Sequence, residues 1–496
     1  MARHQSIPQR QPYLAQPDSI PAVSILTACG PYPPRKFSFS PDSHYPEYPF
    51  HDLAGAENPV YRNVREMLRQ AGLDAARFGT PQWNPLGTFV RTGARVFVLP
   101  NFVFHRRPYE SRARFDAKCT HGSVLRALLD YVFIAAGATA QVSLGNAPLQ
   151  SCVWKRVTRD AGAADLCAFY ARQGRRLELC DLRGLVRQED VLGRSASIER
   201  RAADREIRFD LSAGSLLSDF DAARPRYRVA GYEPAATASY HKENHHVYVL
   251  NRRIAEADVL ISVPKLKTHE KVGITCALKG LVGTISQKEC LAHHRFGSPR
   301  EGGDEYARPT AIAHTLSRFH DFVQSHRHGG HRQHAIEIVE RTLARIYARA
   351  GGRRYGAWHG NDTAWRMALD IARIVAFGTA DGRVNGSPAR TQLVLVDGIT
   401  GGEGDGPLNP DPVDARTLIF ASNAALADYA ACLLMGYEPE RLPLIRHALF
   451  HPTHSIFRGD VSRVAAVVNG AQVLLPALAR ACGHKFLPPR GWRHYL

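Results

Sequence analysis

A strand–helix–strand pattern in the first third of the chain constrains its fold more than any other feature. A short apolar run over residues 95–101 (RVFVLPN) predicts a buried strand that ends in a turn. A helical pattern follows over 123–136 with Gly137 as its C-cap, and 139–144 predicts the next strand. Two strands joined through a helix run parallel in one sheet. The sequence therefore predicts an α/β protein with two lobes, built on mainly parallel sheets with flanking helices.

Later segments continue this alternation. We expect helices over 58–71, 247–257 and 424–435, strands over 259–263, 392–396 and 417–421, and a flexible glycine-rich turn over 400–407. A chain of 496 residues is long enough for two or three domains. The predicted divisions are an N-terminal extension that wraps the core (1–90), an α/β core (91–449) that can split into lobes 91–245 and 246–449, and a C-terminal tail (450–496).

Lysine is scarce in this chain and is concentrated in one segment. The sequence has ten lysines among its 64 Lys and Arg residues. Five of the ten fall within 24 positions after the strand predicted at 259–263, namely Lys265, Lys267, Lys271, Lys279 and Lys288. Arginine supplies positive charge elsewhere, so surface chemistry does not require lysine here. An ammonium group is compact, can lose its proton and can act as a nucleophile, so the cluster indicates a functional site.

The residues between these lysines suit the binding of an anion. The candidates for anion binding are Lys265, Lys267, Gly273 and Thr275, and the candidates for acid–base or nucleophilic chemistry are His269 and Lys279. Alternation along an extended segment is expected to put the first two lysines and the histidine on one side. Crowding of ammonium groups lowers their pKa values, which favours base or nucleophilic chemistry. The alternative is that these lysines pair with acidic residues on a solvated surface.

Two further polar loops follow predicted strands. Ligands of α/β sheets bind beyond the carboxyl ends of the strands. The additional anion-site candidates at such ends are Asn101, His121 and Asn146, and the candidate ligands for a divalent metal ion facing the same cleft are Asp397, Glu403 and Asp428. The alternative for the acidic group is an exposed glycine-rich turn, with the last aspartate capping a buried helix.

Composition narrows the classes of partner and cofactor. The formal net charge is +18, but the basic residues are spread along the chain with acidic ones between them. We therefore expect an anionic small molecule rather than a specific nucleic acid. None of the nine cysteines forms a CxxC pair, so no iron–sulfur cluster is expected and a reducing compartment is favoured. With no signal peptide and no uninterrupted apolar run of membrane-spanning length, the expected location is the cytoplasm.

The segment ADVLISVPKLKTH at 257–269, followed by GxTxxLKxLxG at 273–283, carries a resemblance to a known family. Both motifs resemble those of the DUF362 family, whose closing block DGIxxxEGxGP is similar to 397–407 and whose following helix is similar to 423–436. The family's opening KPN is LPN here, so Leu99 replaces its lysine. The resemblance covers about 91–449. YPEY at 45–48 and WNPLG at 83–87 resemble the extension of a longer subgroup that is sometimes encoded near surface-polysaccharide genes.

A second, more distant resemblance lies in the same loop. His269 and Lys279 are ten residues apart with Gly273 and Thr275 between them, which resembles the HxxxGxTGGxK loop of lactate racemase and its relatives. In that family the lysine tethers a nickel-pincer nucleotide cofactor and the histidine takes part in proton and hydride transfer. As a minor alternative, this resemblance implies an isomerase with a cofactor tethered to Lys279.

These observations leave two main hypotheses from different classes. The first is an enzyme acting on a phosphorylated or carboxylated metabolite, with the loop lysines holding the anion and His269 as the acid–base group. The second is a non-catalytic binding or assembly protein of a surface-polysaccharide pathway, which Leu99 in place of the family lysine favours. The sequence does not identify the substrate, the reaction, the oligomeric state or the cofactor, for which a divalent metal ion is only a candidate.

Overall fold

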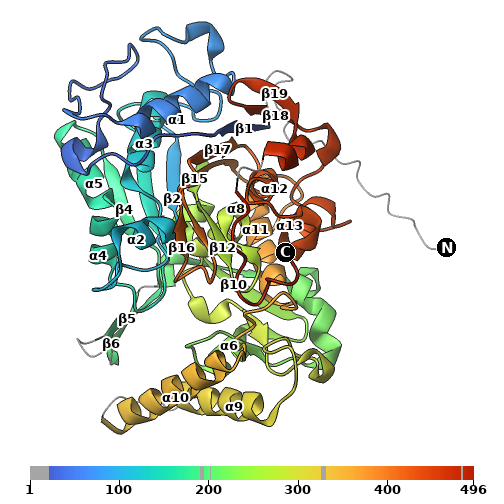
Figure 1. Ribbon diagram of the computed structural model, residues 1–496. Helices are drawn as coiled ribbons and strands as arrows, with labels where there is room; N and C mark the ends of the chain where they lie inside the picture. Colours follow the sequence, from blue (N-terminus) through green and yellow to red (C-terminus); the bar gives the residue numbers. More distant parts are fainter. Residues whose placement is uncertain (1–21, 190–194, 202, 326–330, 482–483) are drawn as a thin grey trace.

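The computed structural model describes residues 22–189, 195–201, 203–325, 331–481 and 484–496. Within these residues the centre of the molecule is a 12-stranded sheet with the strand order β19-β18-β1-β17-β15-β11-β2-β3-β4 (Figure 1). Off this path, β12 and β16 pair with β15, and β13 pairs with β12. The strands are β19 (Ala471–Leu474), β18 (Ala465–Val468), β1 (Val23–Leu26), β17 (Thr417–Ala421), β15 (Thr391–Glu403), β11 (Val259–Val263), β2 (Arg95–Pro100), β3 (Gln141–Asn146), β4 (Leu177–Asp181), β12 (Lys265–His269), β13 (Gly273–Ile274) and β16 (Asp411–Val413).

The centre of this sheet is parallel, as the strand–helix–strand pattern predicted. β15, β11, β2, β3 and β4 pair in parallel, whereas β17 runs antiparallel to β15 and to β1. The carboxyl ends of β2, β3 and β11 therefore meet at one edge of the sheet. β12 continues from β11 after Pro264 and pairs with the far half of β15. The α/β class is confirmed.

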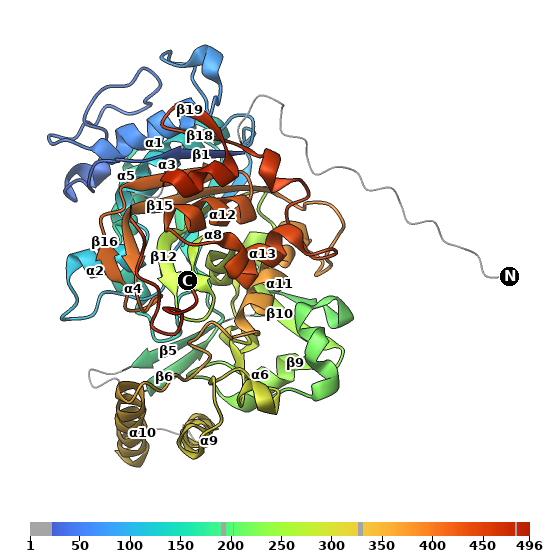
Figure 2. The same ribbon diagram turned by 45° about the vertical axis from the view of Figure 1, so that its right-hand side comes forward.

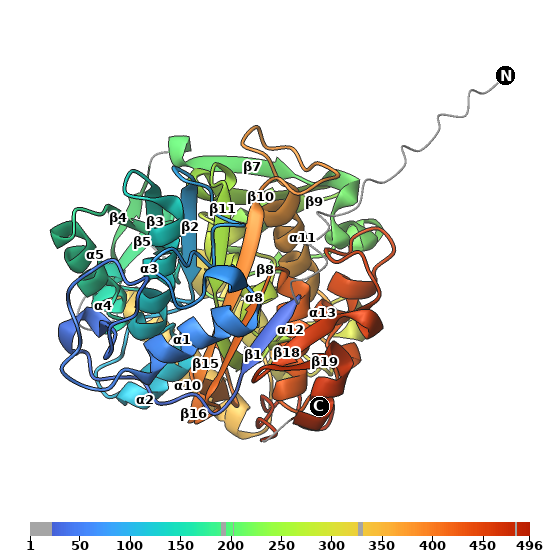
Figure 3. The same ribbon diagram turned by 90° about the horizontal axis from the view of Figure 1, so that it is seen from above.

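Helices cover both faces of the sheet. In β11, Val259, Ile261 and Val263 belong to the core under α1, α3 and α5, and Leu260 belongs to the core under α8, α11, α12 and α13. Figure 3 shows the two helix layers on opposite sides of the strands. A strand that is buried on both faces has a continuous apolar sequence, and this pattern made β11 predictable. The helices are α1 (Pro59–Gln70), α3 (Gly122–Ala136), α5 (Ala163–Arg172), α8 (Cys276–Gly280), α11 (Ala364–Phe377), α12 (Ala424–Leu434) and α13 (Pro443–Phe450).

The helix expected over 247–257 is wrong. Its first five residues lie in strand β10 (His245–Asn251), which pairs with β7 (Glu206–Asp210) and β9 (His241–Lys242) in a separate three-stranded sheet. Val247 and Val249 are stiff at χ1 and favour an extended backbone, and β7 supplies the hydrogen-bonding partner. Only the short α7 (Arg252–Ala255) follows.

The glycine-rich turn expected over 400–407 is also wrong in its first half, because β15 continues as a strand to Glu403. Its glycines serve close packing rather than flexibility. A Cβ on Gly402 would lie 2.7 Å from the Ala117 carbonyl oxygen, and one on Gly401 would lie 2.9 Å from Phe486 Cζ. Only glycine lets α2 (Arg112–Lys118), β12 and the C-terminal segment approach this strand so closely.

Both ends of the chain contribute to the main sheet. β1 pairs with β17 and with β18, so part of segment 1–90 and part of segment 450–496 become neighbouring strands. The helix predicted at 58–71 is present as α1, which packs on α3. The proposed division into extension, core and tail stays a prediction.

Two helices project from the body of the molecule. α9 (Ala311–Ser325) and α10 (His331–Arg349) pack on each other at the end remote from β1, as Figures 1 and 2 show. Among the described helices, none combines the length and the apolar character needed to cross a membrane. The remaining elements are α2 (Arg112–Lys118), α4 (Trp154–Asp160), α6 (Pro234–Tyr240), β5 (Leu185–Glu189), β6 (Ser195–Arg200), β8 (Tyr227–Arg228) and β14 (His294–Arg295).

Candidate functional site

A cavity of about 290 Å³ lies where the β12–α8 segment meets the carboxyl ends of β2 and β3. Its wall contains four lysines and two histidines: Lys267, Lys271, Lys279, Lys288, His269 and His293. Each of these lysines is at most 8% exposed. Glu270 is the one carboxylate among the described residues that line the cavity, and its Oε1 lies 3.9 Å from Lys271 Nζ. The wall is therefore strongly cationic.

A tight reversal of the chain brings the loop residues together. β12 folds back on β13, so that His269 pairs with Gly273. Gly273 has a φ of 84°, and a Cβ there would lie 2.2 Å from Leu442 Cδ2, so only glycine fits this turn. The reversal places Lys271 and Thr275 beside His269 in the cavity wall.

Asp428 fixes the short helix that carries Lys279. Its carboxylate accepts hydrogen bonds from the backbone N–H groups of Ala277 (2.6 Å) and Leu278 (3.0 Å) at the start of α8. Burial raises the pKa of Asp428 to about 7. Asp428 therefore caps a helix inside the core, as the alternative in the sequence analysis allowed.

The structure separates Lys265 from the other loop lysines. Its Nζ lies 3.0 Å from Asp397 Oδ2, and both side chains are completely buried. The pairing of β12 with β15 shifts register between Lys265 and Lys267, so simple alternation does not hold across these residues. Lys267 and His269 line the cavity. Lys265 does not line it and pairs with Asp397 instead.

Three of the four cavity lysines are held by backbone carbonyl groups. Lys267 Nζ donates to the carbonyl of Lys118 at 2.7 Å, and Lys288 Nζ donates to that of Val282 at 3.2 Å. Lys271 Nζ donates to the carbonyl of Tyr355. The fourth, Lys279, makes no hydrogen bond or ion pair within the part of the chain that the structure describes.

Burial lowers the pKa values of these amines. The pKa falls from 10.5 to about 7 for Lys267, Lys279 and Lys288, chiefly because the charged form is desolvated and additionally because of neighbouring lysines. Burial also lowers the pKa of Lys271. Each amine can thus change its protonation state near neutral pH.

The two histidines of the wall present opposite hydrogen-bonding groups. Burial, reinforced by the charge of Lys279, holds the pKa of both imidazoles well below 6.5, so both rings are neutral. His269 Nδ1 accepts the backbone N–H of Lys271 at 3.1 Å, which assigns its proton to Nε2. His293 Nδ1 lies 2.7 Å from the Leu291 carbonyl oxygen and must donate to it, which leaves Nε2 with a lone pair.

Other polar groups of the wall lack partners. Thr275 Oγ1 and Asn101 Nδ2 are buried and make no hydrogen bond within the described residues. Asn146 is fixed by a bond from its Nδ2 to the Pro100 carbonyl (2.7 Å). A buried donor without a partner is costly, so these two groups are available to hydrogen-bond a molecule in the cavity.

His121 and Asp397 belong to a separate buried cluster that includes Tyr32 from the N-terminal extension. The imidazole of His121 stacks on the ring of Tyr32 with centroids 4.0 Å apart, and its backbone N–H donates to Asp397 Oδ2 at 3.0 Å. The Tyr32 hydroxyl donates to Asp397 Oδ1 at 2.6 Å. Neither His121 nor Asp397 lines the cavity.

The three candidate metal ligands have different partners. Asp397 pairs with Lys265, Asp428 caps α8, and Glu403 accepts the backbone N–H of Leu487 at 2.8 Å. Across the described ranges, no group of three or more His, Cys, Asp and Glu side chains is arranged to hold a metal ion. These carboxylates do not form a shared cleft with Lys279.

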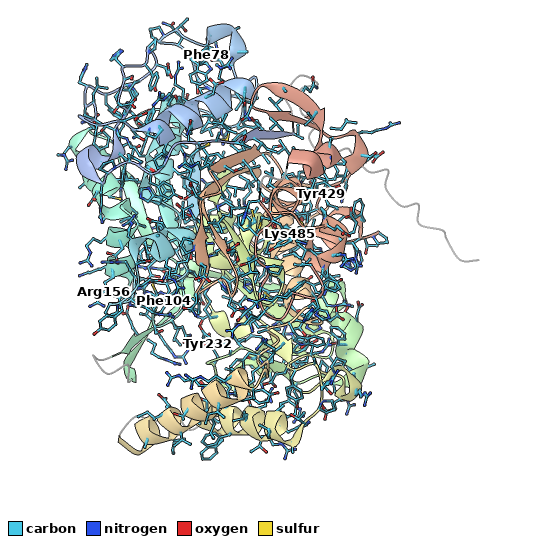
Figure 4. The ribbon with its side chains drawn as sticks, viewed as in Figure 1. Phe78, Phe104, Arg156, Tyr232, Tyr429 and Lys485 are labelled. Atoms are coloured by element: carbon cyan, nitrogen blue, oxygen red, sulfur yellow. The ribbon has the colours of Figure 1, made fainter. Side chains whose placement is uncertain are left out.

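Several cavity residues were absent from the sequence-based list. Lys271, Lys288 and His293 lie in or just after the lysine-rich segment, so the same signal could have included them. Tyr232 and Tyr355 come from distant loops without a motif; Figure 4 places Tyr232 between the main sheet and the α9–α10 pair. Leu99, which replaces the family lysine, is buried in the apolar core.

Comparisons with known proteins give a family match and distant structural similarities. No curated protein matches this chain. The apoprotein of lactate racemase from Thermoanaerobacterium thermosaccharolyticum aligns with 12% identity and a TM-score of 0.26 over 70% of this chain. The alignment spans half of the racemase chain. A similarity at this level does not define a shared fold.

The family match covers a shorter segment than the motif resemblance. Residues 222–433 match the family model described as "Domain of unknown function (DUF362)". This range contains the lysine-rich segment, α8 and Asp428, whereas Asn101, just after β2, and Asn146, at the end of β3, precede it. Over residues 222–433 this chain is therefore similar to the DUF362 family.

Proposed function

We propose that the cavity binds a phosphorylated or carboxylated small molecule and that the protein is an enzyme acting on it. The observation that carries this proposal is the imbalance of charge in the wall. Four buried lysines and one glutamate line the same space, and burying several cations together is unfavourable unless an anion compensates them.

The groups of the wall divide into binding and reacting roles. Lys267, Lys271 and Lys288 are fixed by backbone carbonyls and suit the positioning of an anion. His269 offers a proton from Nε2, and His293 offers a lone pair on Nε2, so together they can donate and accept a proton on a bound molecule. Lys279 has no partner in the described structure and faces the same space.

Binding is tested with sulfate, inorganic phosphate and short carboxylates as probes, followed by calorimetry and by thermal shift. Lys279→Met removes one cavity charge, and Lys155→Met on the exposed surface of α4 is the matched control. We expect the first variant to lose affinity at least about tenfold, because one desolvated charge contact is worth about 1.5–3 kcal/mol, and the control to retain it. Equal affinity in wild type and Lys279→Met would overturn the proposed site.

Catalysis is tested separately from binding. A screen of phosphorylated and carboxylated metabolites is expected to yield a compound that is both bound and converted, with conversion lost in His269→Gln while binding persists. Binding without conversion of any bound compound would instead support the non-catalytic hypothesis.

A further inference from the structure

Lys279 differs from the other cavity lysines in a way that bears on reactivity. Three of these lysines donate an Nζ–H to a backbone carbonyl, so their amines act as hydrogen-bond donors: Lys267, Lys271 and Lys288. Lys279 makes no such bond in the described structure, and its side chain is 7% exposed. When it loses its proton, its lone pair is therefore free to face a ligand in the cavity.

The surroundings of Lys279 favour the unprotonated amine. The positive charge of Lys271 lies close enough to oppose protonation, and burial removes the water that would solvate an ammonium group. A lysine that is desolvated and adjacent to another cation is the arrangement that activates this side chain toward carbonyl compounds. The α8 backbone that carries Lys279 is held by Asp428, so the amine is positioned by a rigid element.

The rest of the wall defines the compound that would fit. The other lysines can hold a carboxylate, as the proposed function requires. Beyond them the lining is apolar, with Val103, Leu149, Val229, Val282, Leu291 and Leu408 among its members. A ligand of this shape has an anionic head and an apolar body.

We propose that Lys279 forms an imine with the carbonyl group of a small 2-oxo acid whose carboxylate is held by the neighbouring lysines. This inference rests on the proposed function, because it uses the same cavity and the same anion-binding wall. The apolar body of the oxo acid would pack on the apolar lining, so phenylpyruvate is expected to bind more tightly than pyruvate.

The step balances without an oxidant or a reductant. Lys279 Nζ forms a bond to the carbonyl carbon and loses one proton, which the Nε2 lone pair of His293 can accept and pass to the carbonyl oxygen, giving a neutral carbinolamine. His269 Nε2–H can then donate a second proton to this hydroxyl, so that the C–O bond breaks and water leaves, and the remaining N–H proton of the iminium returns to His269 Nε2. The products are the neutral imine and one water molecule, and both imidazoles regain their starting protonation states.

The experiment is reductive trapping of the imine. The protein is incubated with pyruvate or phenylpyruvate and sodium cyanoborohydride near pH 7, and the adduct is located by intact-mass and peptide mass spectrometry. We expect one adduct per chain on Lys279, with labelling at least about tenfold above that of Lys155 and Lys242, which are exposed and do not line the cavity. Excess 3-phenylpropanoate, which has the carboxylate and the ring but no carbonyl group, should suppress the labelling.

The controls separate failure of the inference from failure of the proposed function. Lys279→Arg keeps the charge and removes the nucleophilic amine, so it should retain 3-phenylpropanoate binding and lose the adduct, whereas Lys155→Arg on the exposed surface should keep the adduct. Binding of 3-phenylpropanoate without trapping, or with adducts confined to Lys155 and Lys242, would overturn the imine and leave the anion site standing. Absence of binding by 3-phenylpropanoate and by both oxo acids would overturn both.

Discussion

Replacing Lys279 with methionine should make the ligand-free protein more stable, although it removes a residue of the site. Methionine has a similar length and fills the space of the lysine stem without the charge. Lys279 makes no hydrogen bond or ion pair in the described structure, so the substitution breaks none of these contacts. The free energy of unfolding should therefore rise rather than fall.

The expected stability gain in Lys279→Met follows from the lowered pKa of Lys279. Burial shifts the pKa of Lys279 from 10.5 to about 7. Each unit corresponds to about 1.4 kcal/mol, so the cost of holding this amine in the folded state is of the order of 4 kcal/mol at pH 7. Relaxation around the methionine reduces the gain, and we expect an increase of about 2–4 kcal/mol. For 496 residues the unfolding entropy is about 1 kcal/mol/K, so the melting temperature should rise by about 2–4 °C.

The pH dependence of the stability difference between wild type and Lys279→Met tests whether the buried amine causes that difference. Between pH 7 and 10.5 the unfolded chain binds the Lys279 proton and the folded protein does not, so the wild-type protein gains stability from this residue as the pH rises. The variant lacks this contribution, so the stability gap should be largest below pH 7 and should close toward pH 10.5. Urea titrations of wild type, Lys279→Met and the exposed control Lys155→Met at several pH values measure the gap. A destabilised Lys279→Met, or a gap that does not change with pH, would refute the reasoning and indicate a paired lysine.

Three further outcomes follow from the geometry. Lys265→Met should destabilise the protein by about 3–5 kcal/mol because it leaves Asp397 buried without its cation, and adding Asp397→Asn should recover part of the loss in urea titrations. The affinity for sulfate should fall as the pH rises above 7, because the cavity lysines lose their protons there; calorimetry at pH 6 and 8.5 measures the fall, and an unchanged affinity would contradict it. Gly273→Ala should lower both stability and sulfate affinity, since its Cβ would lie 2.2 Å from Leu442 Cδ2. Gly72→Ala, at a similar φ but with open space around it, should cost only the backbone strain, and equal losses in the two variants would contradict the steric argument.

The parts of the fold that the sequence predicted are those set by local pattern. β2, α3 and β3 were visible because an apolar run, a helical period and a C-capping glycine follow one another over 95–146. β10 was misread as a helix because it is buried along most of its length and lacks a period of two. Its partner β7 lies more than thirty residues away, so the pairing that makes it a strand has no local signature.

The residues of the candidate site likewise fall into those that a local sequence pattern predicts and those that depend on distant parts of the chain. One reversal of the chain, between β12 and β13, brings four predicted residues into the same cavity: Lys267, His269, Thr275 and Lys279. Gly273, at this reversal, was visible in the sequence. Other contacts depend on residues that are remote along the chain. Tyr32 meets Asp397 across 365 positions, so neither that contact nor the removal of Asp397 from the cavity could be inferred from spacing.

The contrast between Lys265 and Lys279 is the strongest argument that the cavity exists for a ligand. The two lysines lie on adjoining elements and both are buried, yet Lys265 is neutralised by Asp397 and a tyrosine hydroxyl, whereas Lys279 has no partner in the described structure. A buried carboxylate thus compensates the ammonium group of Lys265, and no such group compensates that of Lys279 in the described structure. An uncompensated amine beside a cavity lined by three more lysines is expected to lower the stability of the ligand-free protein, and the proposed anion, or the proposed oxo acid that reacts with Lys279, would recover that cost on binding.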